Sequence, residues 1–185
     1  MPEKVISEKS LDNLTKANKI SRQLTCEAIE TSLLLLLKEK TFDAISISEL
    51  VRKAGVSRNA FYRNYSSKLS ILESIIKSVI RRLFKQLKTF DLKTQHDQVW
   101  LFLFQEAKKE ASLLKIITEQ HLQPVLISLV AKRLKAYQRL SQHVISKYKS
   151  SFWSNAVVSV LSNWISDDMV IPAEEMANLG LPLLT

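Results

Sequence analysis

The sequence predicts an all-α protein, and two observations lead to this prediction. Glycine occurs only at positions 55 and 180, and proline only at positions 2, 124, 172 and 182, so long stretches lack the residues that interrupt helices. No long segment alternates apolar and polar residues with the period of a β-strand. We therefore expect helices in both the N-terminal and the C-terminal parts of the chain.

The first expected helix covers about residues 19–39. Residues 1–17 are polar without a strong period, and we interpret them either as a flexible N-terminal extension or as an extension of this helix. A second helix is expected to begin at Ile47, because Ser46 and Glu49 form a capping box that satisfies free amide donors at a helix start. One apolar face of this short helix is formed by Ile47, Leu50, Val51 and Ala54.

A tight turn and a third helix follow. Gly55 supplies the positive φ that a helix C-cap prefers, and Ser57 is placed to cap the next helix. In that helix Ala60, Phe61 and Tyr65 are expected to face inward. The outward side chains, which can donate to phosphates or bases, are Arg58, Asn59, Tyr62, Arg63 and Asn64.

The charge of this segment indicates an anionic partner. No acidic residue lies between Val51 and Ile71. Arg58 and Lys68 are predicted in the first turns of helices, where the macrodipole disfavours a cation by about 0.3–1 kcal/mol. A cation is expected there if a phosphate binds, because the phosphate contacts both the cation and the free backbone amides. The alternative interpretation is an ordinary, solvated basic surface.

A resemblance to the tetracycline-repressor (TetR) family of regulators is carried by residues 55–68, which read Gly55-Val56-Ser57-Arg58-Asn59-Ala60-Phe61-Tyr62-Arg63-Asn64-Tyr65-Ser66-Ser67-Lys68. The similarity covers roughly residues 20–87, and residues 38–46 look like the family's link from the first to the second helix. Thr41 stands where many members have glycine. Asn59-Ala60 replaces a commoner small residue plus threonine, which is expected to change the bases that are read.

The resemblance implies a three-helix helix-turn-helix DNA-binding head and a C-terminal helical bundle for dimerisation and ligand sensing. It also implies a homodimeric repressor that binds a palindromic double-stranded DNA operator and responds to an unidentified small-molecule inducer. We assign Arg58 and Asn59 to base edges, since Arg pairs with guanine and Asn with adenine. We assign Ser46, Tyr62, Asn64 and Lys68 to phosphates. The whole predicted DNA-binding set is Ser46, Ser57, Arg58, Asn59, Ala60, Tyr62, Arg63, Asn64 and Lys68.

The remaining chain reads as a connecting helix and a second domain. We expect an extension at 1–17, the helix-turn-helix domain at 18–66, a connecting helix at 67–90 and the ligand-sensing and dimerisation domain at 91–185. Residues 1–90 hold 17 Lys and Arg against 9 Asp and Glu, whereas residues 91–185 hold 10 against 9. This asymmetry suits a DNA-binding N-terminal domain, and a membrane-surface role is the lesser explanation. Further helices are expected at about 67–88, 95–109, 111–120, 122–149, 151–166 and 172–180.

The helix expected at 151–166 is the candidate for self-association, because its apolar face is broader than one neighbour needs. The alternative is a helix that lies at the centre of its own subunit. The TetR resemblance also implies a dimer interface formed by the last helices, and the segment from Trp164 to Met176 is similar to the branch that includes dihydroxyacetone-kinase regulators. The predicted interface residues are Phe152, Trp153, Ala156, Val157, Val160, Leu161 and Trp164.

A ligand pocket between helices is the second expectation for this domain, since ligand sites are mostly apolar with few polar anchors. The same residues could equally form a core. The three histidines, His96, His121 and His143, have no acidic helix partner of metal-site type, so we expect neither a metal nor a cofactor. The candidate lining residues are Trp100, Leu103, Phe104, Ile117, His121, Leu126 and Tyr137.

Several protein classes are disfavoured by the sequence. Two glycines cannot make a Walker loop or a dinucleotide fingerprint, and there is no nucleophile elbow, so we expect no enzyme. The run Leu33 to Leu37 is far short of a membrane span, and the single Cys26 suits a reducing, cytoplasmic location. The competing hypothesis is a TetR-like interaction module that acts through a partner regulatory protein.

Overall fold

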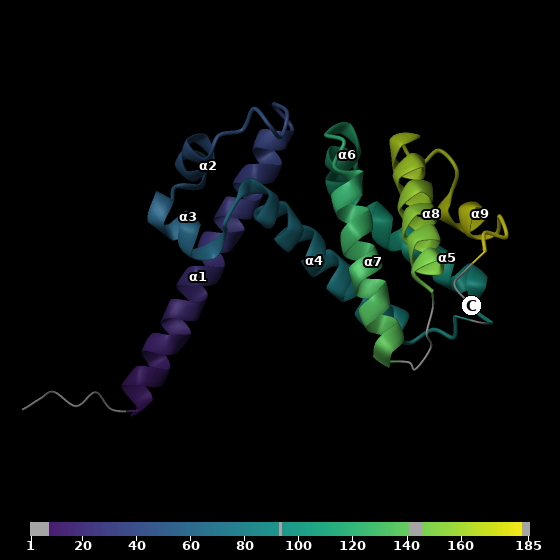
Figure 1. The fold of residues 1–185 in the computed structure, drawn as a ribbon, viewed down its shortest axis with the longest axis horizontal. Helices are drawn as coiled ribbons and strands as arrows, with labels where there is room; N and C mark the ends of the chain where they lie inside the picture. The colour runs from purple at the N-terminus through teal and green to yellow at the C-terminus, as the bar shows by residue number, and fades with distance from the viewer. Residues whose placement is uncertain (1–7, 93, 141–145, 183–185) are drawn as a thin grey trace, which may run out of the picture. The chain divides into compact units, whose positions relative to one another are not determined.

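The computed structural model describes residues 8–92, 94–140 and 146–182 (Figure 1), except for the side chains of Glu8 and residues 137–140. The chain divides into two compact units between Leu72 and Glu73. Within the described ranges every regular element is an α-helix, which confirms the predicted all-α fold. No helix of the described chain is long and apolar enough to cross a membrane.

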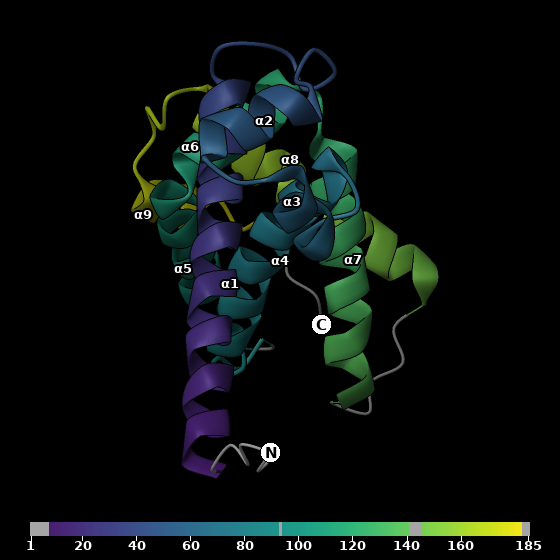
Figure 2. The same ribbon diagram turned by 90° about the vertical axis from the view of Figure 1, so that its left-hand side faces the viewer.

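The N-terminal unit contains α1 (Glu8–Leu37), α2 (Ile47–Ala54), α3 (Arg58–Asn64) and the start of α4 (Lys68–Leu87). Residues 8–17 extend the first helix, as one of the two interpretations of residues 1–17 has it, because α1 runs without a break from Glu8. Residues 1–7 lie outside the described ranges. Both views show α1 running well beyond α2 and α3 toward its N-terminus (Figure 2).

The core of the N-terminal unit forms where α2 and α3 pack against the C-terminal half of α1. Tyr65, which was expected to face inward, is 7% exposed, and its hydroxyl donates to a carboxylate oxygen of Glu30 over 2.7 Å. This bond ties the end of α3 to α1. Cys26 lies half-buried on α1 as a free thiol. The fully buried side chains of this unit include Ile29, Leu33, Leu50, Phe61, Ile71 and Leu72.

The C-terminal unit contains the rest of α4 with α5 (His96–Lys109), α6 (Ala111–Glu119), α7 (Gln123–Leu140), α8 (Lys147–Ser166) and α9 (Ala173–Ala177). The single helix predicted over 122–149 is wrong. The hydroxyl of Ser146 accepts the amide of Lys149 over 3.3 Å, so residues 147–149 begin α8 rather than ending α7. Helix α9 is also shorter than the predicted 172–180.

Aromatic side chains from two helices form the centre of the C-terminal unit. The ring of Phe104 on α5 lies 5.6 Å from that of Trp100 and 5.0 Å from that of Trp164 on α8, measured between ring centroids. The indole of Trp100 donates to the carbonyl of Leu181 over 2.9 Å, and the indole of Trp164 donates to that of Ile171 over 2.8 Å. Because both indole donors are satisfied by the C-terminal segment, this cluster fixes the end of the chain against α5 and α8.

Candidate nucleic-acid interface and ligand cavity

The helix-turn-helix has the caps that the sequence predicts. The hydroxyl of Ser46 accepts the amide of Glu49 over 3.2 Å, and that of Ser57 accepts the amide of Ala60 over 3.1 Å. Gly55 ends α2 in the left-handed conformation, with φ of 66°. Arg58 and Asn59, the first two residues of α3 after the capped turn, are both exposed.

The outward face of α3 carries two cations and one phenol. The guanidinium of Arg58 donates to the hydroxyl of Ser48 on α2, which orients it across the turn. Arg63 is exposed, and its Nε donates to the carbonyl of Asn59 over 3.4 Å. Tyr62 is 55% exposed, and its ring stands edge-on to the buried Phe61. These exposed donors can reach an anion without a change in the fold.

Asn64 has contacts within the N-terminal unit that the sequence did not reveal. It is half-buried, and its side-chain amide donates to the carbonyl of Ala60 over 2.8 Å. Its carbonyl oxygen accepts Nε of Arg22 on α1 over 2.9 Å. Ala60 is also half-buried. The assignment of Asn64 and Ala60 to DNA stays a prediction, and the structure shows a role for Asn64 in joining α3 to α1.

Lys68 also contacts the protein itself. Its ammonium donates to the carbonyls of Phe42, over 2.7 Å, and Asp43, over 3.3 Å, and to the carbonyl of Ile45. It also lies 4.9 Å from the centroid of the Phe42 ring. An ammonium has three N–H donors, so these carbonyls account for all of them. Its predicted phosphate contact is untested, and its observed contacts hold the loop between α1 and α2.

Two lysines near the turn form ion pairs with glutamates. Lys40 lies 2.6 Å from a carboxylate oxygen of Glu49, and Lys53 lies 3.0 Å from one of Glu39. The hydrogen bond from Lys40 is the main reason why the pKa of Glu49 lies below its usual value. Arg52, Arg58 and Arg63 remain exposed on α2 and α3. On the described helices α2 and α3, the cations outside these ion pairs are therefore guanidinium groups, which bind phosphates and guanine in a bidentate way.

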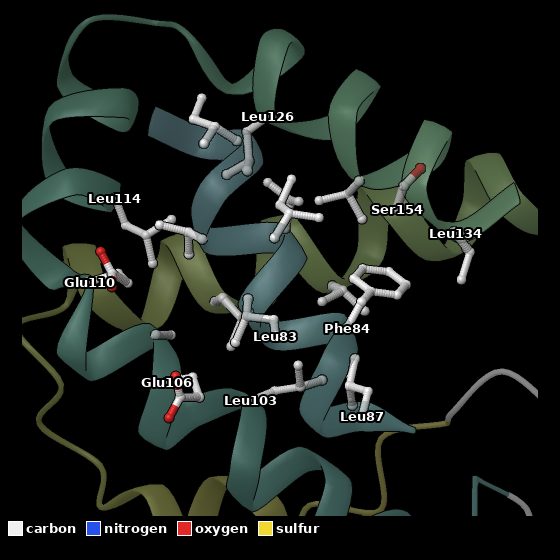
Figure 3. Close-up of a pocket in the computed structure, with 18 of the residues that line it drawn as sticks. Leu83, Phe84, Leu87, Leu103, Glu106, Glu110, Leu114, Leu126, Leu134 and Ser154 are labelled. Carbon is white, nitrogen blue, oxygen red and sulfur yellow. The ribbon is translucent and has the colours of Figure 1, made fainter. Parts of the chain in front are cut away.

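The C-terminal unit contains a cavity of about 170 Å³, which is lined by α4, α5, α6, α7 and α8 (Figure 3). Of the predicted lining residues, Leu103, Ile117 and Leu126 are present there. Trp100 and Phe104 belong instead to the aromatic core, as the alternative interpretation had it. His121 is exposed with φ of 55°, and it does not line the cavity. The side chain of Tyr137 and the whole of His143 lie outside the described ranges.

Sequence reasoning missed the wall that α4 contributes. Its apolar stripe supplies Ile76, Val79, Ile80, Leu83, Phe84 and Leu87 to the cavity, together with Trp153 of α8. Glu106 and Glu110 lie together on one side of the cavity, opposite Phe84 and Leu134 (Figure 3). The carboxylate of Glu110 accepts Nη2 of Arg82 over 2.5 Å, and Glu106, which is 4% exposed, pairs with Lys109 and with Arg82.

The predicted dimer-interface residues fall into two groups. Trp153 and Trp164 are buried in the core of their own unit, and the half-buried Val157, Val160 and Leu161 also face inward toward the core or the cavity. Phe152 and Ala156 instead line a shallow groove between α6, α7 and α8. Phe152 is 61% exposed and Tyr148, one turn earlier, is 74% exposed. The outward face of α8 thus starts with two large apolar side chains.

Within the described ranges no group of three or more His, Cys, Asp and Glu side chains is placed to hold a metal ion. Among the described residues, the helix-turn-helix and the cavity are two features that offer binding chemistry. One presents exposed guanidinium groups at a helix N-terminus, and the other encloses apolar space within a helical bundle.

Residues 34–75 match the model of the family described as bacterial regulatory proteins, tetR family. Over 73 residues, the chain is 36% identical to YxbF of Bacillus subtilis (strain 168), an uncharacterized HTH-type transcriptional regulator. This match covers 40% of the present chain and spans only 19% of that relative's length. The family match begins in the N-terminal unit and ends at residue 75.

Solved structures extend the similarity of fold to most of the chain. Lin0861 from Listeria innocua superposes with a TM-score of 0.76 at 18% identity, covering 86% of this chain and 88% of that one. The fatty acid degradation regulator FadR from Bacillus halodurans has a TM-score of 0.54 at 16% identity, covering 83% and 90%. FadR from Bacillus subtilis, solved in complex with stearoyl-CoA, has a TM-score of 0.52 at 14% identity, covering 82% and 93%.

The family signature, the capped turn and the exposed α3 surface occur in the same residues. Residues 55–68, which carry the resemblance, contain Gly55 in the left-handed conformation and Ser57 as a cap. They lie entirely within the 34–75 match. Over this helix-turn-helix domain, the chain is similar to the tetR family of bacterial regulatory proteins.

Proposed function

We propose that the protein is a transcriptional regulator that binds a palindromic DNA operator as a homodimer and responds to a small molecule, most simply as a repressor. The observation that carries the proposal is the exposed face of α3, which presents Arg58, Asn59 and Tyr62 from a capped helix-turn-helix. A helix-turn-helix places such residues against base edges in the major groove.

The two base-reading roles are assigned to Arg58 and Asn59. Both side chains are exposed at the start of α3, and their chemistry suits guanine and adenine, respectively. We assign phosphate contacts to Tyr62 and Arg63, which are exposed, and the amides at the start of α3 add donors for the same anions. The contact between Arg58 and Ser48 supports this assignment, because it holds the guanidinium near the helix start before DNA binds.

Dimerisation sets the spacing of the two recognition helices. Paired helices must lie about 34–36 Å apart to read successive turns of the major groove. We assign the dimer contact to the outward face of α8 that begins with Tyr148 and Phe152, since exposed apolar side chains of this size favour burial against a second copy. This face replaces the wider set of interface residues that the sequence predicts.

The cavity of the C-terminal unit is the proposed inducer site. Its apolar walls suit a small organic molecule, and the similarly folded FadR of Bacillus subtilis was solved with stearoyl-CoA. An inducer acts by stabilising a dimer whose helix-turn-helix motifs are wrongly spaced. Relief of repression by about 100-fold requires about 2.7 kcal/mol of differential affinity for that dimer.

Selection from a random duplex library, followed by anisotropy titration of the selected duplex at two salt concentrations, tests the DNA-binding claim. We expect a palindrome to be enriched and bound in a salt-sensitive manner. Weak binding without sequence preference would contradict the proposal and favour a regulator that acts through a protein partner.

The role of Arg58 is tested with the selected duplex. Arg58→Ala should lower discrimination at one base pair by about 1–3 kcal/mol and bind random DNA almost as the wild type does. Arg81→Ala, which removes an exposed arginine of the C-terminal unit, is the matched control and should leave discrimination unchanged. Equal losses on selected and random DNA for Arg58→Ala would show that this side chain reads no base.

A further inference from the structure

The cavity of the C-terminal unit has walls made almost entirely of aliphatic and aromatic carbon. Its two carboxylates, those of Glu106 and Glu110, are held by Arg82 and Lys109, so they offer the cavity little beyond their hydrocarbon stems. A ligand with polar groups along its length would leave them without partners here. The part of the ligand that enters the cavity must therefore be hydrocarbon.

One cation of α7, Arg133, is half-buried beside the residues that line the cavity, although it is not one of the lining residues itself. Leu126, Val130 and Leu134 line the cavity from α7, at positions i, i+4 and i+8. Arg133 lies at i+7 in the same series, so it occupies a position where the helix presents its apolar face. A charged residue at this position is costly for folding alone, because a leucine would bury more apolar surface.

The guanidinium of Arg133 has an unsatisfied donor. Its Nε is buried and has no hydrogen-bond partner among the described residues. The guanidinium carbon lies 5.8 Å from the centroid of the Phe84 ring, and Phe84 itself lines the cavity. Buried donors of charged groups are rarely left unpaired in native proteins, because the loss of hydration is not offset. This donor is thus available to an acceptor that arrives with a ligand.

We propose that the ligand is a single-chain amphiphile whose aliphatic chain fills the cavity and whose anionic head group, a carboxylate or a phosphate, binds Arg133. The proposal deepens the ligand-responsive function above and rests on it for its regulatory meaning. The two ends of the site recognise different parts of the ligand. The apolar walls select for a chain, and the arginine fork selects for an anion over a neutral or cationic head group.

The test compares octanoate, octyl phosphate, octanol and octylamine, which share one chain and differ in the head group. Binding is followed by fluorescence of the intact protein, because Trp153 lines the cavity. We expect at least one of the two anions to bind roughly tenfold or more tightly than octanol, as a charge-assisted hydrogen bond implies, and octylamine to bind most weakly. The anion that binds more tightly, octanoate or octyl phosphate, identifies the head group. Equal affinity for octanol and both anions, tightest binding of octylamine, or no binding at all would overturn the proposal.

Substitutions assign the preference to one side chain. Arg133→Met should remove the preference for the anion and leave octanol binding nearly unchanged, which also shows that the variant is folded. Arg133→Lys should keep part of the preference, because it retains the charge without the fork. Lys132→Met, which removes the exposed neighbour on α7, is the matched control and should behave as the wild type does. A preference that survives in Arg133→Met would exclude this residue as the anchor.

Release of the selected operator duplex separates this inference from the proposed function. Release by the anion in the wild type but not in Arg133→Met supports both. If the anion binds through Arg133 and the operator stays bound, the proposed ligand site is supported and the proposed ligand-responsive function is contradicted. If octanol or octylamine releases the operator and the anions do not, the ligand response stands and the anionic class is overturned.

Discussion

Three cations of the N-terminal unit differ in what their side chains contact, and this difference determines what each can do. Arg58 is exposed, and its guanidinium donates to the hydroxyl of Ser48. Lys40 is paired with a carboxylate, and Lys68 donates to three backbone carbonyls. A residue that already satisfies the backbone contributes to stability, whereas an exposed one is available for a partner.

Lys68 is predicted to matter for stability. Lys68→Met should lower the free energy of unfolding of the N-terminal unit by about 1–3 kcal/mol, because it leaves carbonyls without donors. Hydrogen exchange of the α2 and α3 amides measures this change in the absence of DNA. Lys77→Met, which breaks an exposed pair with Glu73, should change stability by less than about 1 kcal/mol. Unchanged exchange in Lys68→Met, with a smaller salt slope of DNA binding, would contradict this stability role and support the predicted phosphate contact instead.

The contact between Lys40 and Glu49 makes a pH-dependent contribution. Since the pKa of Glu49 is lowered in the folded state, its contribution to stability is present above the pKa of the unfolded chain. It is lost as the pH falls through the lower, folded pKa. Carboxyl NMR titration should show that Lys40→Met raises the pKa of Glu49 toward 4.5. Lys53→Met, which breaks the neighbouring pair with Glu39, should leave the pKa of Glu49 unchanged.

Local signals in the sequence predict the exposed residues of the site better than the contacts of the half-buried ones. The cap of Ser57 and the outward direction of Arg58 follow from neighbours within one turn. The bonds from Arg22 to Asn64 and from Lys68 to Phe42 join residues far apart in the chain. Helical spacing carries no information on such pairs, so the sequence could not indicate that these donors are engaged.

The elements of the helix-turn-helix depend on one glycine. Gly55 has φ of 66°, and its amide donates to the carbonyl of Arg52 over 3.3 Å as the cap of α2. The next amide, of Val56, donates to the carbonyl of Val51 over 3.0 Å. These two bonds end α2 and set the direction in which α3 begins.

A side chain at position 55 is expected to cost only backbone strain, because a Cβ there meets no atom within 4 Å. Gly55→Ala should lower the stability of α2 and α3 by about 1 kcal/mol, and Gly55→Asn by less, since asparagine tolerates this conformation. Amide exchange in the two helices measures both. Gly180→Ala, with the same φ and equally open surroundings, should leave that exchange unaffected. A loss of several kcal/mol in Gly55→Ala would mean that packing, not conformation, requires glycine.

Helix boundaries were predictable where a cap marks them. The starts of α2 and α3 follow from Ser46 and Ser57, and both are as predicted. The break before α8 was missed although Ser146 caps that helix, because no glycine or proline lies nearby and the apolar period continues. The start of α1 at Glu8 was left open, since its exposed first turns show little apolar period.

At the scale of the molecule, the division into two units does not follow the charge asymmetry: residues 1–72 hold 12 Lys and Arg against 8 Asp and Glu, and residues 73–185 hold 15 against 10, because α4 carries several basic residues after Glu73. Residues 1–90 carry most of the net charge, and the cavity is lined only by residues from Ile76 onward. The sequence predicted the charge asymmetry from counting alone. It could not predict the cavity, because the same apolar stripes would also describe five helices packed without a void between them.

Self-association is predicted to depend on the outward face of α8. Phe152→Glu should weaken the dimer by about 2 kcal/mol or more, because it places a charge in the centre of an apolar contact. Sedimentation velocity over a range of concentrations measures the change. Val170→Glu, at an apolar residue that is 81% exposed after α8, is the control and should remain dimeric. A Phe152→Glu protein that stays dimeric would place the interface elsewhere.

The cavity of about 170 Å³ also gives the C-terminal unit a volume that unfolding can remove. Water fills such space once the helices separate, so the unfolded chain occupies less volume and hydrostatic pressure favours it. All three tryptophans lie in this unit, so their emission under pressure reports on it directly. A molecule that occupies the cavity removes part of that volume difference. Resistance to pressure would therefore report on occupation of the cavity, beside the rise in melting temperature that binding to the folded state brings.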